Sequence, residues 1–109
     1  MTELFEELAG LDRLIHEPAR LAILTALTAC DRTDFLFLQR LTGLTKGNLS
    51  SHLGKLEAAG LVEIEKGFVR KTPHTDVCLT AIGRQAVERH WEQLNRLRQG
   101  TLTWQPGDV

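Results

Sequence analysis

The stretch LTKGNLSSHLGKLEAAGLV, residues 44–62, decides the fold. Three leucines in it recur at intervals of four and three residues, the spacing of one helix face: Leu49, Leu53 and Leu56. Thr45 is a preferred N-cap residue, and Gly60 suits the left-handed position that follows the end of a helix. The pattern therefore predicts a helix over about 45–59 whose leucine face packs against a core.

The opposite face of this predicted helix carries only small or polar side chains. An exposed face without bulky apolar residues fits the major groove of B-DNA, which is about 12 Å wide. Amide, hydroxyl and ammonium groups bind base edges and phosphates, although the lack of arginine predicts a modest base readout supplemented by DNA shape. We therefore predict a recognition helix with these contact residues: Thr45, Lys46, Gly47, Asn48, Ser50, Ser51, His52 and Lys55.

The residues before this helix predict three more helices and a tight turn. Apolar residues at helical spacing over 4–15 predict a first amphipathic helix that ends near residue 16. A proline then suits the first turn of a second helix over about 18–30. A polar break at 31–34 can cap a short third helix, and Gly43 supplies the left-handed residue that a helix-to-helix turn requires.

The residues after the quoted stretch predict a β-hairpin. Alternating apolar and polar residues over 61–66 and 75–80 indicate two strands, and the loop over 67–74 is too long for a two-residue turn. The loop is basic, so we expect a wing over about 66–75 that contacts the DNA backbone or minor groove. Its predicted contact residues are Lys66, Arg70, Lys71 and His74. Phe68 is expected in the core at the base of this wing.

Helix, helix, tight turn, helix, hairpin and long helix is the element order of a winged helix-turn-helix, mainly α with a small β-hairpin (α+β). Characteristic runs are LTKGNLSSHL (44–53), KLEAAGLV (55–62), EKGF (65–68), PHT (73–75) and LTAIGR (79–84). These residues resemble the compact single-domain regulators of bacteria and archaea that are related to the MarR and ArsR families. The resemblance spans about residues 10–98 and implies a homodimeric transcriptional regulator that binds double-stranded DNA.

Apolar residues at both ends of the chain predict a symmetric dimer. Thr80 can cap a last helix that runs to about Gln99. This helix and the first one carry more apolar surface than a monomer of this size easily hides. The expected dimerisation residues are Leu4, Phe5, Leu8, Leu11, Trp91, Leu94 and Leu97. A twofold dimer would place two recognition helices ~34 Å apart, one turn of DNA.

The 109 residues suffice for one domain, expected over 1–99, followed by a loose tail over 100–109. The net charge of −1 shows no basic excess, but residues 1–17 are acidic whereas residues 66–74 contain no acid. A locally basic surface on an acidic protein is therefore expected. No apolar run reaches the roughly 18 residues of a membrane span and no secretory signal is present, which predicts a cytoplasmic protein without membrane contact.

Two alternatives stay open from the sequence: a winged helix used as a protein–protein adaptor, and a redox or metal switch on the same scaffold. Cys30 and Cys78 lack a CxC motif and basic neighbours, so we interpret them as small buried apolar residues whose redox activity the sequence does not decide. No metal ligand set, cofactor or catalytic motif is recognisable, so no enzyme is expected. A small-molecule effector of unknown identity would bind at the dimer interface.

Overall fold

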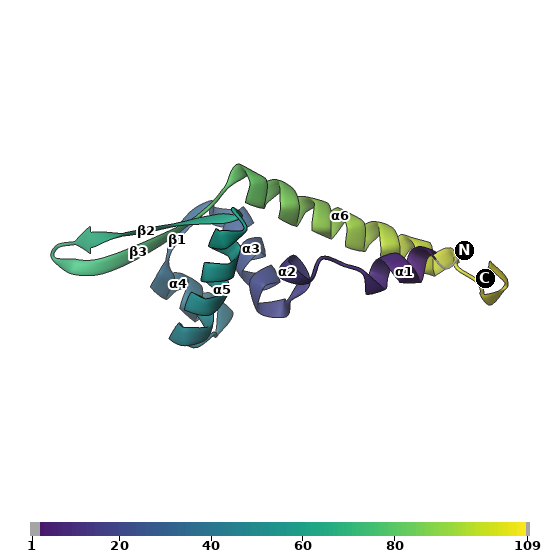
Figure 1. Ribbon diagram of the computed structural model, residues 1–109, viewed down its shortest axis with the longest axis horizontal. Helices are drawn as coiled ribbons and strands as arrows, with labels where there is room; N and C mark the ends of the chain where they lie inside the picture. Colours follow the sequence, from purple (N-terminus) through teal and green to yellow (C-terminus); the bar gives the residue numbers. More distant parts are fainter. Residues whose placement is uncertain (1–2, 109) are drawn as a thin grey trace.

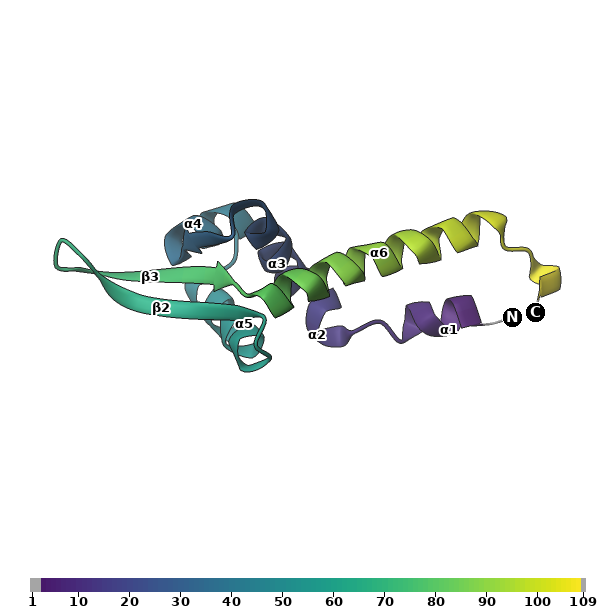
Figure 2. The ribbon, with the colours of Figure 1, turned by 90° about the horizontal axis from the view of Figure 1, so that it is seen from above.

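The protein is an elongated helical molecule with a small sheet near one end, as the computed structural model shows for residues 3–108 (Figure 1). Its extents are 65 × 25 × 21 Å. The elements in chain order are α1 Glu3–Ala9, α2 Arg13–His16, α3 Pro18–Cys30, β1 Arg32–Asp34, α4 Phe35–Thr42, α5 Lys46–Ala58, β2 Val62–Val69, β3 Thr72–Leu79, α6 Ala81–Thr103 and the 3-10 helix η1 Pro106–Asp108. The β2–β3 hairpin projects from one end, and α1 lies beside α6 at the other (Figures 1 and 2).

The apolar faces of α3 and α5 form the centre of the core. The residues of α3 and α5 whose side chains are 0–1% exposed are Ile23, Leu24, Leu27, Leu49, Leu53 and Leu56. The hairpin closes this core with Val62 and Val77, and α6 closes it with Val87. The helix spacing in the sequence therefore predicted the packed face of α5 correctly, together with the bounds of α3.

The capping residues predicted for α4, α5 and α6 are confirmed. The Asp34 side chain accepts from the Phe37 backbone N–H at 2.7 Å, and the Thr45 hydroxyl accepts from the Asn48 N–H at 3.1 Å. The Thr80 hydroxyl in turn accepts from a backbone N–H in the first turn of α6. These caps satisfy donors that have no partner within the helix.

The sheet has three strands in the order β1-β3-β2, both pairs antiparallel. β1 occupies the polar break in which no strand was predicted. Its three residues have no apolar alternation, and they become a strand because they pair with β3, for example Thr33 with Val77. Such a strand is set by a distant partner, so the local sequence pattern does not reveal it.

The hairpin is longer and more tightly closed than predicted. β2 runs to Val69 and β3 starts at Thr72, so the expected loop over 67–74 is wrong. The two turn residues, Arg70 and Lys71, have φ angles of 51° and 67°. Positive φ at both positions is typical of the two-residue turn that matches strand twist, although asparagine and glycine usually occupy it. Because neither Arg70 nor Lys71 is an asparagine or a glycine, the sequence did not predict a two-residue turn here.

The N-terminal segment contains two helices where one was predicted. α1 ends at Ala9, and the N–H of Gly10 still bonds to the carbonyl of Glu6 at 3.0 Å. Asp12 then caps α2, because its carboxylate accepts from the Leu14 N–H at 2.9 Å. A cap inside an amphipathic pattern starts a new helix, and here it interrupts the apolar periodicity.

The last helix continues beyond its predicted end near Gln99. α6 runs to Thr103, and the ring of Trp104 packs edge-on against Phe5 with centroids 4.9 Å apart. Residues 100–104 are therefore ordered against α1, where a loose tail was expected; residues 1, 2 and 109 of the expected domain and tail lie outside the described residues. Among residues 3–108, no helix combines the length and apolar character that a membrane crossing requires.

Gly83 marks a close approach between α6 and the backbone of Leu61. A Cβ atom at this position would lie 2.0 Å from the backbone oxygen of Leu61, whereas a Cβ at Gly54 on α5 would meet no atom within 4 Å. Both glycines are helical, so they form a matched pair.

We predict that Gly83→Ala lowers the free energy of unfolding by at least about 1–3 kcal/mol, because the added methyl group must push α6 away from Leu61. Gly54→Ala should raise it by about 1 kcal/mol, because alanine is the better helix former. Denaturant titration followed by circular dichroism measures both. Equal midpoints for Gly83→Ala and the unmodified protein would contradict the close contact.

Candidate nucleic-acid interface

The polar face of α5 is open to solvent along its length. Thr45, Lys46, Gly47, Asn48, Ser50, Ser51 and Lys55 are all exposed, while the three leucines behind them are buried. The short turn from Gly43, which has a φ of 71°, to Thr45 joins α4 to α5. The predicted contact residues on α5 therefore lie together on one accessible face, with the exception of His52.

His52 is half-buried and is held by the N-terminal helices. Its Nδ1 accepts a hydrogen bond of 3.1 Å from Nη1 of Arg20, since a guanidinium can only donate. Arg20 is buried and also donates to the backbone carbonyls of Leu14, at 2.6 Å, and Arg13, at 3.2 Å. Through Arg20 of α3, His52 thus connects α5 to α2 and α3, which gives it a positioning role that the sequence did not indicate.

The hairpin has two chemically different faces, because side chains alternate along each strand. One face carries Ile64, Lys66 and Phe68 on β2, which pair with Val77, Thr75 and Pro73 on β3. Ile64, Lys66 and Thr75 line a groove together with Lys46 and Ser50, so this face is turned toward the polar side of α5. We call it the helix-side face of the hairpin.

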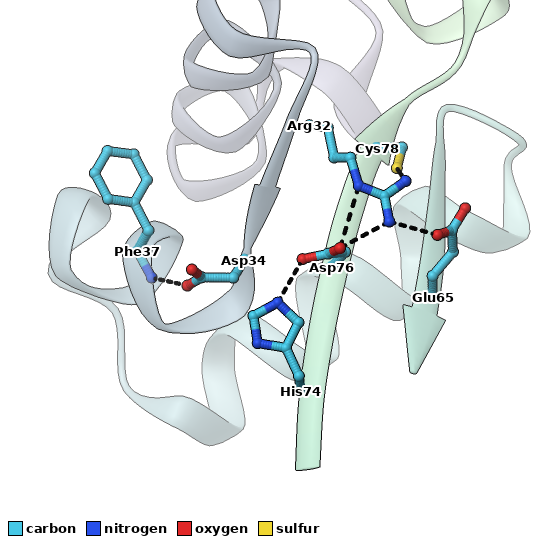
Figure 3. Close-up of polar contacts among 7 residues, drawn as sticks. All are labelled: Arg32, Asp34, Phe37, Glu65, His74, Asp76 and Cys78. Atoms are coloured by element: carbon cyan, nitrogen blue, oxygen red, sulfur yellow. Dashed lines mark hydrogen bonds and ion pairs between the residues drawn. The ribbon is translucent and has the colours of Figure 1, made fainter. Parts of the chain in front are cut away.

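The other face of the hairpin carries the acidic residues and is organised by Arg32 of β1 (Figure 3). The Arg32 Nη2 atom lies 2.6 Å from Glu65 and 2.7 Å from Asp76. The hydrogen bonds that Arg32 donates to Asp76, followed by one from His74, hold the pKa of Asp76 below its usual range. One guanidinium therefore bridges all three strands and offsets the negative charge at the base of the hairpin.

His74, one of the predicted DNA contacts of the wing, lies on this acidic face of the hairpin. Its Nε2 is 2.8 Å from a carboxylate oxygen of Asp76, so the imidazole is already engaged within the protein (Figure 3). The signal that was missed is the spacing of two residues from His74 to Asp76, which places both on one side of a strand.

The exposed cations of α5, of the helix-side face and of the hairpin tip make no ion pair within the part of the chain that the structure describes. Lys46, Lys55, Lys66, Arg70 and Lys71 are exposed, and none of them makes an ion pair with another residue in the described range. By contrast, Arg32 and Arg96 are paired with acids. Arg40 of α4, which the sequence analysis overlooked, lines a hollow with Lys46 and Pro73 and extends the basic surface.

The residues expected at a dimer interface divide into two groups. Leu11 and Leu97 are only 8% and 2% exposed and pack inside the chain, and Leu4 and Leu94 are half-buried. Phe5, Leu8 and Trp91 are each 42% exposed. An ion pair between Glu7 and Arg96 ties α1 to α6 in a two-helix arm (Figure 2), and Phe5 and Leu8 belong to its α1 helix. Trp91 lies closer to the body of the fold, where its indole N–H donates to the Thr25 hydroxyl of α3 at 3.2 Å.

The groups considered for a redox or metal switch are dispersed. Cys30 is exposed, so its expected burial is wrong, and Cys78 is half-buried with a thiol pKa raised chiefly by burial. His16 and His90 approach to 2.9 Å between ring nitrogens, and burial lowers the pKa of His90. Within the described part of the chain, no three potential ligands gather to hold a metal ion.

Comparisons with known proteins agree with this geometry. Residues 19–98 match the family described as winged helix DNA-binding domain. The solved transcriptional regulator homologue from Pyrococcus horikoshii OT3 is 30% identical and has a TM-score of 0.83, over 91% of this chain and 97% of its own. An uncharacterized protein of Methanocaldococcus jannaschii is 31% identical, over 78% of this chain and 92% of its own. A MarR-family regulator from Silicibacter pomeroyi, 24% identical, has a similar fold, with a TM-score of 0.64 over 97% and 69% of the two chains.

Proposed function

Since the chain belongs to the winged helix DNA-binding domain family and has the fold of MarR-type transcriptional regulators, we propose that it regulates transcription by binding specific double-stranded DNA as a homodimer. The observation that carries the proposal is the exposed polar face of α5 beside the exposed Lys66 on the helix-side face of the hairpin, with Arg70 and Lys71 at the tip. In this proposal α5 enters the major groove, and the hairpin tip lies on the backbone or in the minor groove.

The residues of α5 divide by what their side chains can reach. Asn48 can donate to and accept from an adenine edge, and Ser50 and Ser51 can bond to bases or phosphates. Lys46 and Lys55 at the two ends of the exposed face supply charge to the phosphates. His52 acts indirectly, because its bond to Arg20 fixes the helix against α2 and α3.

The arm of α1 and α6 supports the proposed homodimer. Two paired helices form too thin a layer to bury all their apolar side chains: Phe5 and Leu8 of α1 remain exposed, and so does Trp91 of α6 where that helix meets α3. A twofold axis at the arm would cover them and leave the hairpins free to reach DNA at the far ends. In this proposal the chain has no catalytic role and acts in the cytoplasm, and any small-molecule effector would bind at the dimer interface.

Binding to a duplex should depend strongly on salt. If Lys46, Arg70 and Lys71 of each protomer neutralise about six phosphates per dimer, the slope of log affinity against log salt is about −5. Arg70→Asn with Lys71→Gly suits a turn with positive φ, so this variant should fold normally while its slope moves to about −2. Fluorescence anisotropy with a labelled duplex measures both slopes.

The matched control removes two exposed cations from the arm, Arg89→Gln with Arg98→Gln, and should keep the original slope. Salt-independent binding by the unmodified protein would contradict the proposed function. The adaptor alternative predicts no retention of DNA at any salt concentration.

The dimer is tested by light scattering at micromolar concentration. Leu8→Glu places a charge among the exposed apolar residues of the arm and should give monomers. Ile82→Glu alters a side chain that is 64% exposed at the opposite end of α6 and should leave the dimer intact. A monomeric unmodified protein would rule out the symmetric arrangement.

A further inference from the structure

Phe68 is the most exposed large hydrophobic side chain among the described residues, at 75%. We had expected it in the core at the base of the wing, and the structure shows that this is wrong. The strand extends farther than the sequence indicated, so Phe68 lies near the hairpin tip, beyond the reach of the core. A bare phenyl ring in water costs free energy, which raises the question of what covers it.

The strand register places Phe68 beside a second apolar group. Its cross-strand partner is Pro73, also exposed, and strand alternation puts both on the helix-side face together with Lys66. Val69 is the next residue and points to the opposite face. The apolar pair therefore projects on the side of the hairpin that faces the polar surface of α5.

The charge around this pair indicates a polyanionic partner. Lys66 precedes Phe68 on the same face, and Arg70 and Lys71 follow at the turn, all exposed and without ion pairs among residues 3–108. The acids of the hairpin, Glu63, Glu65 and Asp76, belong to the other face. A protein partner that binds an apolar side chain does not require three cations around it. The groove of a nucleic acid does, because phosphates line both of its edges.

We propose that Phe68, backed by Pro73, is an apolar wedge that enters the minor groove next to the major groove occupied by α5. Proteins that insert phenylalanine or proline at a base step partly unstack it and kink the duplex. The cations at the turn would hold the flanking phosphates while the ring presses between bases. This inference rests on the proposed DNA binding and adds to it a source of sequence preference.

The wedge supplies specificity that α5 lacks. The exposed face of α5 has no arginine for bidentate guanine recognition, so its direct readout is limited. Pyrimidine–purine steps such as TA unstack at low cost, whereas A-tracts are stiff. A wedge therefore favours flexible steps at a fixed distance from the bases that α5 contacts.

The test compares two duplexes of roughly 30 base pairs that have equal composition and charge, one of alternating dA and dT and one a dA·dT homopolymer. Phe68→Ala should weaken binding to the alternating duplex about tenfold and leave homopolymer binding unchanged. Val69→Ala, the matched control on the opposite face, should change neither affinity. A fluorescent adenine analogue at the TA steps should brighten with the unmodified protein and with Val69→Ala, and should stay quenched with Phe68→Ala.

Two results would overturn the wedge while DNA binding stands. In the first, Phe68→Ala keeps both the preference for the alternating duplex over the homopolymer and the fluorescence change. In the second, Phe68→Ala and Val69→Ala lose this preference and the fluorescence change equally. Circular dichroism confirms that each variant is folded. If the unmodified protein binds neither duplex in a salt-dependent way, the proposed function itself fails, and the wedge fails with it.

Discussion

The structure depends on the burial of one leucine face. Leu49, Leu53 and Leu56 are sealed against α3 and the hairpin, and burying each contributes about 1.5–3 kcal/mol. Because these side chains occupy one side of α5, its small and polar side must face solvent. The same contacts that stabilise the fold therefore orient the surface that we assign to DNA, and a rotation of α5 would expose leucine and bury serine and asparagine.

The hairpin completes that surface through a separation of charge between its faces. Arg32 gathers Glu65 and Asp76 on one face, whereas Lys66 lies on the other face and makes no ion pair with another residue of the described range. A protein with a net charge of −1 can in this way present a local basic surface to phosphate. The turn residues add two cations at the tip, in a backbone conformation that is costly for side chains other than asparagine or glycine.

The sequence predicted those parts of the fold that local chemistry determines: the leucine periodicity and caps of α5, the bounds of α3, and the winged-helix element order of the family to which the chain belongs. It failed where a distant partner decides. β1 exists because β3 pairs with it, and Trp104 is ordered by Phe5. At the site, the exposed residues of α5 lie as expected, whereas the positions of His52 and Phe68 required the tertiary structure.

The most direct test is an amide chemical-shift titration of the isotope-labelled protein with a DNA duplex. The account predicts shifts over α5 residues 46–55 and over both strands of the hairpin from Lys66 to Thr75, with little change at the exposed Phe37 and Leu41 of α4. Shifts confined to α4 or to the arm of α1 and α6, with α5 unaffected, would contradict it.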